Sequence, residues 1–153
     1  MAIFSTIFVT LLFLTTVTST CPNGWTRHND SCYLFSHDKE DWPGATVMCK
    51  LMGGDLVEIQ TEAEAKYLSQ QVKLYNESYW IALSDASEEG SWQWMISKDP
   101  VTYTNWAPGQ PDNNVRNENC ADIWPNGLWN DGQCFAPHHY ICEIQDENVG
   151  IIG

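Results

Sequence analysis

The stretch that decides the fold is residues 110–131, QPDNNVRNENCADIWPNGLWND. Cys120 lies inside this stretch and Cys134 follows shortly after it. Five oxygen-bearing side chains stand out, those of Gln110, Asp112, Glu118, Asn130 and Asp131. Carboxylate and amide oxygens without His or Cys suit a hard cation, and a flexible site of high coordination number suits Ca²⁺ better than Mg²⁺. A polar surface loop is the alternative, but the cysteines and the flanking tryptophans favour a cation site.

The chain of 153 residues has the length of one domain. An apolar run at residues 7–14 is followed by small residues up to position 20, which is typical of a secretory signal peptide and too short to span a membrane. We therefore expect a signal peptide at 1–20, one domain at 21–145, and a short tail at 146–153. No second long apolar run follows, so we expect a secreted, extracellular protein without membrane insertion.

The cysteines all lie after the predicted signal peptide, at Cys21, Cys32, Cys49, Cys120, Cys134 and Cys142. An even number in an exported chain predicts three disulfides, and spacing alone does not choose among the 15 pairings. No CxxC or HExxH motif occurs, so nothing supports a zinc or thioredoxin site. Asn29 and Asn76 begin sequons for N-glycosylation, a pattern that also occurs by chance.

The formal net charge is −13. Nucleic-acid binding requires a basic surface, and anionic membranes attract basic segments, so the charge argues against both partners. It is compatible with cations, cationic partners or a mineral surface. The alternative is that the acidity only keeps an exported protein soluble.

The helices are expected in the first half of the chain. Residues 40–52 have helical spacing, with Asp41 as a cap and Pro43 in the first turn, and Gly53 ends the segment. A capping box from Thr61 to Glu64 opens a second helix through about Lys73, whose inward residues are Ala65, Leu68 and Val72.

The strands are expected mainly in the second half. They are predicted near Trp25 and at 33–35, 79–83, 92–95, 120–124 and 140–144, with much of 99–131 as ordered loop. Helices followed by strands predict an α+β fold. Ordered loops of this length in a compact domain are usually functional.

Ten short motifs follow one another along the chain: Cys21-Pro22, Gly24-Trp25, Cys32-Tyr33, Trp80-Ile81-Ala82-Leu83, Trp92-Gln93-Trp94, Asn105-Trp106, Gln110-Pro111-Asp112, Glu118-Asn119-Cys120, Trp129-Asn130-Asp131 and Ile141-Cys142-Glu143. In this order they resemble the C-type lectin domain across nearly all of 21–143, and residues 103–113 are especially similar to molluscan secreted lectins of the perlucin type. The resemblance implies two helices flanking antiparallel sheets, a long calcium-binding loop region, and the disulfides Cys21–Cys32, Cys49–Cys142 and Cys120–Cys134.

The resemblance also implies a Ca²⁺ site formed by Gln110, Asp112, Glu118, Asn130 and Asp131. In the family, two adjacent sugar hydroxyls complete the coordination shell, which implies carbohydrate binding by the first four of these residues. The amide-then-acid order around Pro111 resembles the galactose and N-acetylgalactosamine type, whereas the reverse order goes with mannose. Pro111 is expected to be cis, since an X–Pro bond is where that isomer costs little.

Two departures from the family pattern concern the surroundings of this site. Galactose-binding members place a stacking Trp where this chain has Asn114, and Trp124 is the nearest substitute, with core packing as its alternative role. Trp106 and Trp129 are expected to be structural. An accessory Ca²⁺ site would fall on Asp85, Glu89, Asn113 and Asn119, and we expect it to be weak or empty because the last two are amides. The alternative is an acidic loop at 84–89 that faces solvent.

The expected function is recognition or agglutination of glycan-coated cells or glycoproteins, as in innate immunity. Because all six cysteines are assigned to internal bonds, multivalency would come from a non-covalent homo-oligomer. The alternative is the same fold binding mineral or protein surfaces without sugar. An enzyme is not expected, because no motif places an acid or nucleophile around His138 and His139. An EF-hand starting at Asp112 fails, since Asn117 stands where Gly is required.

Overall fold

The computed structural model of the protein describes residues 20–145. The predicted signal peptide, apart from Thr20, and the predicted tail lie outside the described residues. The helical elements are α1 (Trp42–Leu51), α2 (Glu62–Tyr75) and the short 3-10 turn η1 (Asn114–Arg116). The strands are β1 (Thr26–His28), β2 (Ser31–Phe35), β3 (Asp55–Leu56), β4 (Tyr79–Ser84), β5 (Gln93–Trp94), β6 (Cys120–Ile123), β7 (Trp129–Gly132) and β8 (His139–Gln145). Within this part of the chain, no helix is both long and apolar enough to cross a membrane.

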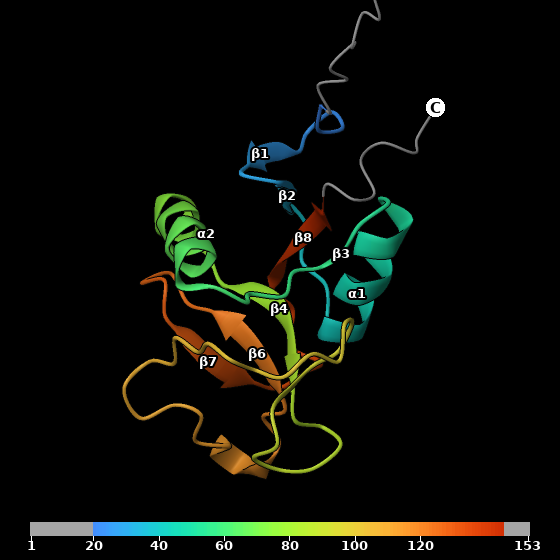
Figure 1. Ribbon diagram of the computed structural model, residues 1–153. Helices are drawn as coiled ribbons and strands as arrows, with labels where there is room; N and C mark the ends of the chain where they lie inside the picture. Colours follow the sequence, from blue (N-terminus) through green and yellow to red (C-terminus); the bar gives the residue numbers. More distant parts are fainter. Residues whose placement is uncertain (1–19, 146–153) are drawn as a thin grey trace, which may run out of the picture.

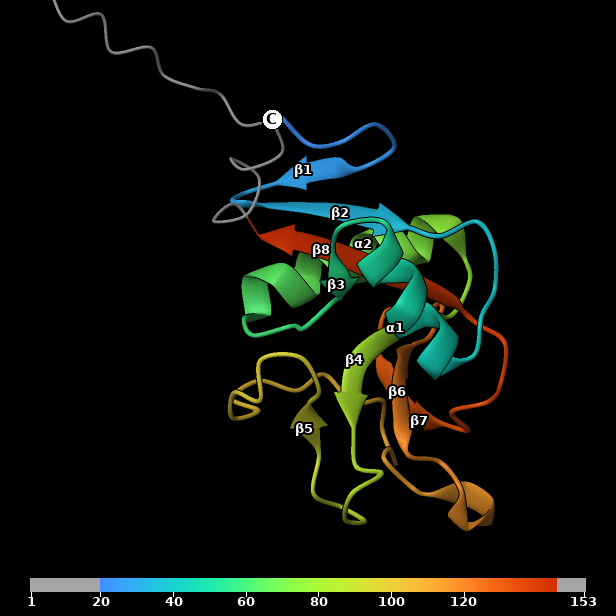
Figure 2. The same ribbon diagram turned by 90° about the vertical axis from the view of Figure 1, so that its right-hand side faces the viewer.

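The strands form a mixed sheet in the order β1-β2-β8-β4-β6-β7, with β3 beside β8 and β5 beside β4. Neighbours are antiparallel except β4 and β8, which pair in parallel. The helices α1 and α2 lie on opposite sides of the sheet (Figure 1). Both views place the long loops at the end of the molecule away from β1 (Figure 1, Figure 2). The predicted α+β arrangement is confirmed.

Local capping explains where both predicted helices begin. The Asp41 carboxylate accepts a hydrogen bond from the Gly44 amide at 2.7 Å, which caps α1. Thr61 Oγ1 accepts from the Glu64 amide at 3.2 Å, which caps α2. The Glu64 carboxylate accepts from the Gln60 amide, one residue earlier than a capping box places it. The predicted helices are confirmed, although α2 runs on to Tyr75.

The predicted strands at 33–35, 79–83, 120–124 and 140–144 are confirmed with small changes at their ends, and the strand at 92–95 is reduced to β5. The strand expected near Trp25 begins one residue later, as β1. Much of 99–131 is loop, as expected, but β7 was not among the predicted strands. Asn, Asp and Gly are depleted in strands, but all four residues of β7 pair with β6. Non-local pairing therefore overrides the local preference.

The disulfides are Cys21–Cys32, Cys49–Cys142 and Cys120–Cys134, as the resemblance implied. The second joins α1 to β8 across 93 residues, and the third closes the β6–β7 hairpin. Cross-links of this kind stabilise mainly by restricting the unfolded chain.

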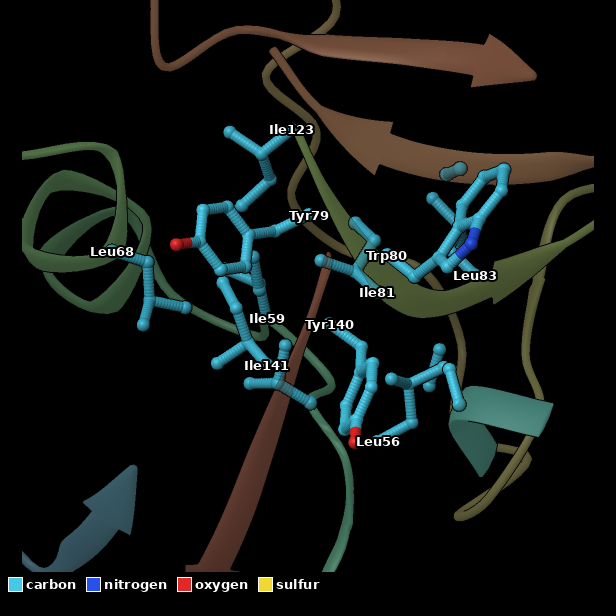
Figure 3. Close-up of a cluster of buried hydrophobic side chains, with 14 of the residues drawn as sticks. Leu56, Ile59, Leu68, Tyr79, Trp80, Ile81, Leu83, Ile123, Tyr140 and Ile141 are labelled. Atoms are coloured by element: carbon cyan, nitrogen blue, oxygen red, sulfur yellow. The ribbon is translucent and has the colours of Figure 1, made fainter. Parts of the chain in front are cut away.

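The hydrophobic core lies between the sheet and the two helices, α1 and α2. The predicted inward residues of α2, Ala65, Leu68 and Val72, are all buried. Figure 3 shows Leu68 directed at side chains from β4, β8 and the segment before α2, namely Tyr79, Ile141 and Ile59. Trp80, Trp94 and Trp129 are fully buried. This packing holds β6 and β7, and therefore the residues at their loop-facing ends, in fixed positions.

Candidate metal and ligand site

Three carboxylates meet at the loop end of the molecule. One ligand oxygen from each of Asp112, Glu118 and Asp131 lies within 4.8 Å of the other two. Asp131 belongs to β7, while Asp112 and Glu118 lie on either side of η1. The Gln110–Pro111 peptide bond that leads into this loop is cis, as expected. The structure thus brings together the three acids of the predicted calcium site.

Backbone amides of the loop hold these carboxylates in place. Asp131, which is 1% exposed, accepts from the amides of Asp112 at 3.1 Å and Asn113 at 2.7 Å. The Asn114 amide donates to Glu118 Oε2 at 2.7 Å and to Asp112 Oδ1 at 3.2 Å. The loop around η1 is therefore wrapped around the acids rather than extended away from them.

The backbone around η1 is strained. Val115 has φ +54° and Arg116 has φ +56°, in the left-handed region that β-branched residues rarely enter. Such conformations cost of order 1–3 kcal/mol and persist only where the surroundings enforce them. The hydrogen bonds of Asn114 to Asp112 and Glu118 supply that constraint.

The electrostatics of the cluster favour a cation. Burial raises the pKa of Glu118, and the nearby charges of Asp131 and Asp112 raise it further. The Lys and His ion pairs of residues 20–145 involve Glu77 and Asp55, not these acids. Three carboxylates this close repel one another. A bound divalent cation would remove that repulsion.

Gln110 provides an independent test of fit. Its Oε1 atom is buried and has no hydrogen-bond partner among the described residues. Buried polar atoms almost always find a partner, and an orphaned acceptor two residues from Asp112 fits a metal ligand. The donor set is purely oxygen, which suits Ca²⁺. The residues present therefore fit the ion that the sequence predicts.

Asn130 precedes Asp131 in β7, but its side chain makes its hydrogen bonds elsewhere. Its Nδ2 donates to Asp122 Oδ1 at 3.0 Å and to the backbone oxygen of Asp131 at 2.7 Å. Both amide hydrogens are therefore used within the protein. The hydrogen bond expected from Asn130 to a sugar hydroxyl requires one of them to be exchanged.

Asp122 is a neighbour of the site that the sequence analysis did not single out. It lies in β6 directly opposite Asn130 and is 1% exposed. Burial raises its pKa to about 7, and the hydrogen bond from Asn130 opposes that shift. Its position, two residues after Cys120 in the strand that faces β7, is the signal that could have found it.

The predicted accessory residues lie on neighbouring loops. Asn113 Nδ2 donates to Glu89 Oε2 at 2.6 Å, and the Asp85 amide donates to the backbone oxygen of Asn119 at 3.2 Å. Asp85 is 2% exposed, and its Oδ1 has no hydrogen-bond partner among the described residues. Burial raises the pKa of Asp85. For Asp85 the alternative of a solvent-facing acidic loop is therefore wrong, because this side chain points inward.

Trp124 lies just after β6, on the side of Asp122 away from Cys120, so its role as a substitute stacking Trp stays a prediction. It follows β6 at the end away from Glu118, roughly 13 Å beyond Cys120 at about 3.3 Å per strand residue. Its turn packs on α2, where Ser69 Oγ donates to the Gly127 backbone oxygen at 2.7 Å. Register places Trp124 here because β6 pairs with β7 without a break.

Trp106 and Trp129 are structural, as expected, since Trp129 is fully buried and the two rings pack at 5.8 Å. The histidine pair is likewise held by packing. The His138 ring lies 4.5 Å from Trp80, and burial, followed by Lys39, lowers the pKa of His138. His139 Nε2 lies 3.8 Å from Glu77 Oε2.

The two sequons lie on accessible turns. Asn29 stands between β1 and β2, Asn76 caps the end of α2, and both are exposed. Exposure is required for glycosylation of folded protein, and the modification itself stays a prediction.

The comparisons with known proteins show the family to which the chain belongs. The profile of the lectin C-type domain matches residues 38–144, and the chain belongs to this family. It is 39% identical over 130 residues to human C-type lectin domain family 10 member A, covering 80% of this chain and 40% of that protein. It is 38% identical over 129 residues to the perlucin-like protein of Mytilus galloprovincialis, covering 80% and 81%.

A solved structure supports the same assignment. The mouse scavenger receptor C-type lectin carbohydrate-recognition domain superposes with a TM-score of 0.76 at 38% identity, covering 82% of this chain and 96% of that one. The family consists of binding proteins rather than enzymes and is generally Ca²⁺-dependent. Some relatives are much longer, since the chain spans about two fifths of the human protein.

Proposed function

We propose that the protein is a secreted lectin that binds galactose-type sugars through Ca²⁺. Carbohydrate recognition as such follows from the family. The observation that carries the finer proposal is the cluster of Asp112, Glu118 and Asp131 beside the unpartnered oxygen of Gln110. As in other extracellular modules, we expect a Kd for Ca²⁺ on the order of 10⁻⁴–10⁻³ M.

The residues divide the work at the proposed site. Gln110, Asp112, Glu118, Asn130 and Asp131 would hold the ion, which would supply open positions for two adjacent sugar hydroxyls. Asp112 and Glu118 accept hydrogen bonds from those hydroxyls, because ionised carboxylates are acceptors only. The amides of Gln110 and, once one of its hydrogens is exchanged, of Asn130 donate to the hydroxyls. An amide before Pro111 and an acid after it supports the galactose type.

The apolar face of the sugar receives less support here than in relatives with a stacking Trp. Asn114 is exposed and polar, and Trp124 lies at the other end of β6. A single shallow metal-centred site without this contact buries little surface, so we expect a single domain to bind weakly, with a Kd on the order of 10⁻³ M. We therefore expect glycan-coated cells and glycoproteins to be the natural ligands, in an immune-type role, because they offer many copies of the sugar.

The net charge of −13 favours one alternative, binding of a mineral or a cationic protein surface without sugar. Such binding would depend on total charge rather than on the geometry of one site. It would be screened by salt and would not be reversed by free galactose.

Retention on immobilised galactose separates the two functions. We expect retention in millimolar Ca²⁺ and elution by a chelator or by free galactose. Glu118→Gln should abolish retention, because it removes a ligand charge and an acceptor. The matched control is Glu62→Gln, the same change at an exposed position of α2. A wild-type protein that passes through the column with Ca²⁺ present would contradict the proposal.

A further inference from the structure

Asp122 is a buried carboxylate that the proposed ligand set does not use. It lies in β6, opposite Trp80 of β4 on one side and Asn130 of the edge strand β7 on the other. Its Oδ2 atom is buried and has no hydrogen-bond partner among the described residues. An unsatisfied buried acceptor destabilises the folded state. Stability therefore does not explain why a carboxylate occupies position 122.

The contact between Asp122 and Asn130 determines which way the Asn130 amide faces. The two atoms that Asn130 meets, Asp122 Oδ1 and the Asp131 backbone oxygen, are both acceptors. A reversed amide would direct its own oxygen at them, which is unfavourable. Only the orientation with Nδ2 toward Asp122 satisfies both contacts. Asn130 Oδ1 is then the polar atom left free for a ligand.

We propose that Asp122 is a positioning residue of the calcium site, which keeps the Asn130 amide oriented so that Oδ1 is available to Ca²⁺ next to Asp131. This inference rests on the proposed calcium-dependent function. Hydrogen-bond partners of metal ligands act in this way, by setting ligand orientation before the metal binds. Asp122 itself would contact neither the ion nor the sugar.

Gly132 supports the same arrangement. A Cβ at this position would lie 3.2 Å from the Trp80 ring and 3.5 Å from Asp122 Oδ1. A larger side chain would therefore crowd the space in which Asp122 reaches Asn130. The absence of a side chain at 132 leaves that contact undisturbed.

Two substitutions of similar size test the role. Asp122→Leu removes the acceptor, whereas Asp122→Asn keeps a carbonyl oxygen that accepts from Asn130 Nδ2. We expect calorimetry to show Ca²⁺ affinity lowered by roughly 10- to 100-fold in the Leu variant, and close to wild type in the Asn variant. In chelator, we expect the thermal midpoint of the Leu variant to stay close to that of wild type, because loss of the unsatisfied Oδ2 acceptor offsets the Asn130 amide hydrogen that is left without a partner.

The possible outcomes distinguish a failure of this inference from a failure of the proposed calcium-dependent function. A wild-type protein that takes up no Ca²⁺ contradicts the proposed function. If wild type binds and Asp122→Leu binds equally well or better, Asp122 does not position the ligand. If the Leu variant fails to fold in chelator while the Asn variant folds, Asp122 is required by the fold, which also overturns the inference. Lost affinity with retained stability, restored by Asn, supports it.

Discussion

At the residue scale, the two side chains that flank Pro111 have opposite hydrogen-bonding capacity. Gln110 offers amide hydrogens, while Asp112 offers acceptors only. The hydroxyls of galactose and mannose approach a metal with different geometry, so the order of donor and acceptor can select between them. Asp112 is held in place by two hydrogen bonds: the Asn114 amide donates to its carboxylate, and its own amide donates to the Asp131 carboxylate.

Exchanging the two side chains should exchange the preference. In the double variant Gln110→Glu and Asp112→Asn, we expect inhibition by mannose to strengthen relative to galactose by at least about tenfold, equivalent to roughly 1.4 kcal/mol. Competition against an immobilised glycoprotein measures the ratio. Gln70→Glu with Asp99→Asn makes the same chemical exchange at exposed positions and should leave the ratio unchanged. Equal inhibition before and after the exchange at 110 and 112 would show that this pair does not set specificity.

Because Glu143 in β8 is buried, we expect the stability of the protein to depend on pH. It is 8% exposed, and burial raises its pKa from 4.5 to about 7. The folded state therefore binds this proton more tightly than the unfolded chain. The stabilising contribution is complete below about pH 4.5 and is lost as the pH rises through about 7, where an ionised carboxylate has to be buried.

Glu143→Gln should remove this dependence while keeping an acceptor for Ser31 Oγ, which donates to Glu143 at 2.7 Å. Between pH 5 and pH 8, we expect the free energy of unfolding of the variant to rise relative to that of wild type by up to about 3 kcal/mol. Urea unfolding in the presence of chelator, at several pH values, gives the difference directly. Parallel curves for the two proteins across this range would rule out a raised pKa at Glu143.

At the scale of elements, the β6–β7 hairpin carries the site at one end and packs on α2 at the other. Its turn approaches the helix so closely that a Cβ on Gly127 would lie 2.8 Å from both Lys73 Cε and Ser69 Cβ. Gly127 also has φ +83°, a conformation that favours glycine. The position of the hairpin thus depends on a residue without a side chain.

Gly127→Ala and Gly53→Ala separate the effects of backbone conformation and packing. Gly53 has φ +86°, but a Cβ there would meet nothing within 4 Å. Both variants incur a left-handed penalty of about 1–2 kcal/mol. Gly127→Ala must also displace α2, which adds about 1–3 kcal/mol. The midpoints of urea unfolding measure both. Equal losses in the two variants would mean that the contact between the turn and α2 does not constrain the hairpin.

At the scale of the whole molecule, the single proposed site, which we expect to be weak, and the net charge of −13 set the conditions for function. Weak sites give strong adhesion only when several are presented together. The described cysteines are all paired within the chain. Valency from a single domain therefore requires self-association without disulfides, and the charge of −13 opposes such association at low salt.

We expect a non-covalent dimer or larger assembly in Ca²⁺-loaded protein, favoured by moderate salt that screens the charge. Light scattering at two salt concentrations measures the mass, and agglutination of galactose-bearing cells measures the function in the same samples. Agglutination should rise and fall with the assembled fraction. A protein that remains a strict monomer under conditions in which it agglutinates cells would contradict this source of multivalency.

Local interactions determined much of this protein from the sequence alone. The starts of α1 and α2 follow from Asp41 and Thr61, whose hydrogen bonds span three residues. The cation chemistry of the site follows from residue type, because acids and amides without His or Cys define a hard oxygen site. The order of motifs was sufficient to indicate the family and, through it, the pairing of the cysteines. None of these inferences depends on which residues far apart in the sequence come into contact.

Only the tertiary structure decided the features that depend on strand pairing. β7 is a strand because it pairs with β6, against the local preference of Asn and Asp. The same register sets Asp122 opposite Asn130 and carries Trp124 to the far end of the hairpin, beside α2. Register depends on contacts between segments far apart in the sequence, and a shift of one residue reverses which face each side chain occupies. No local pattern carries that information, so the residue that orients Asn130 became visible only in the folded chain.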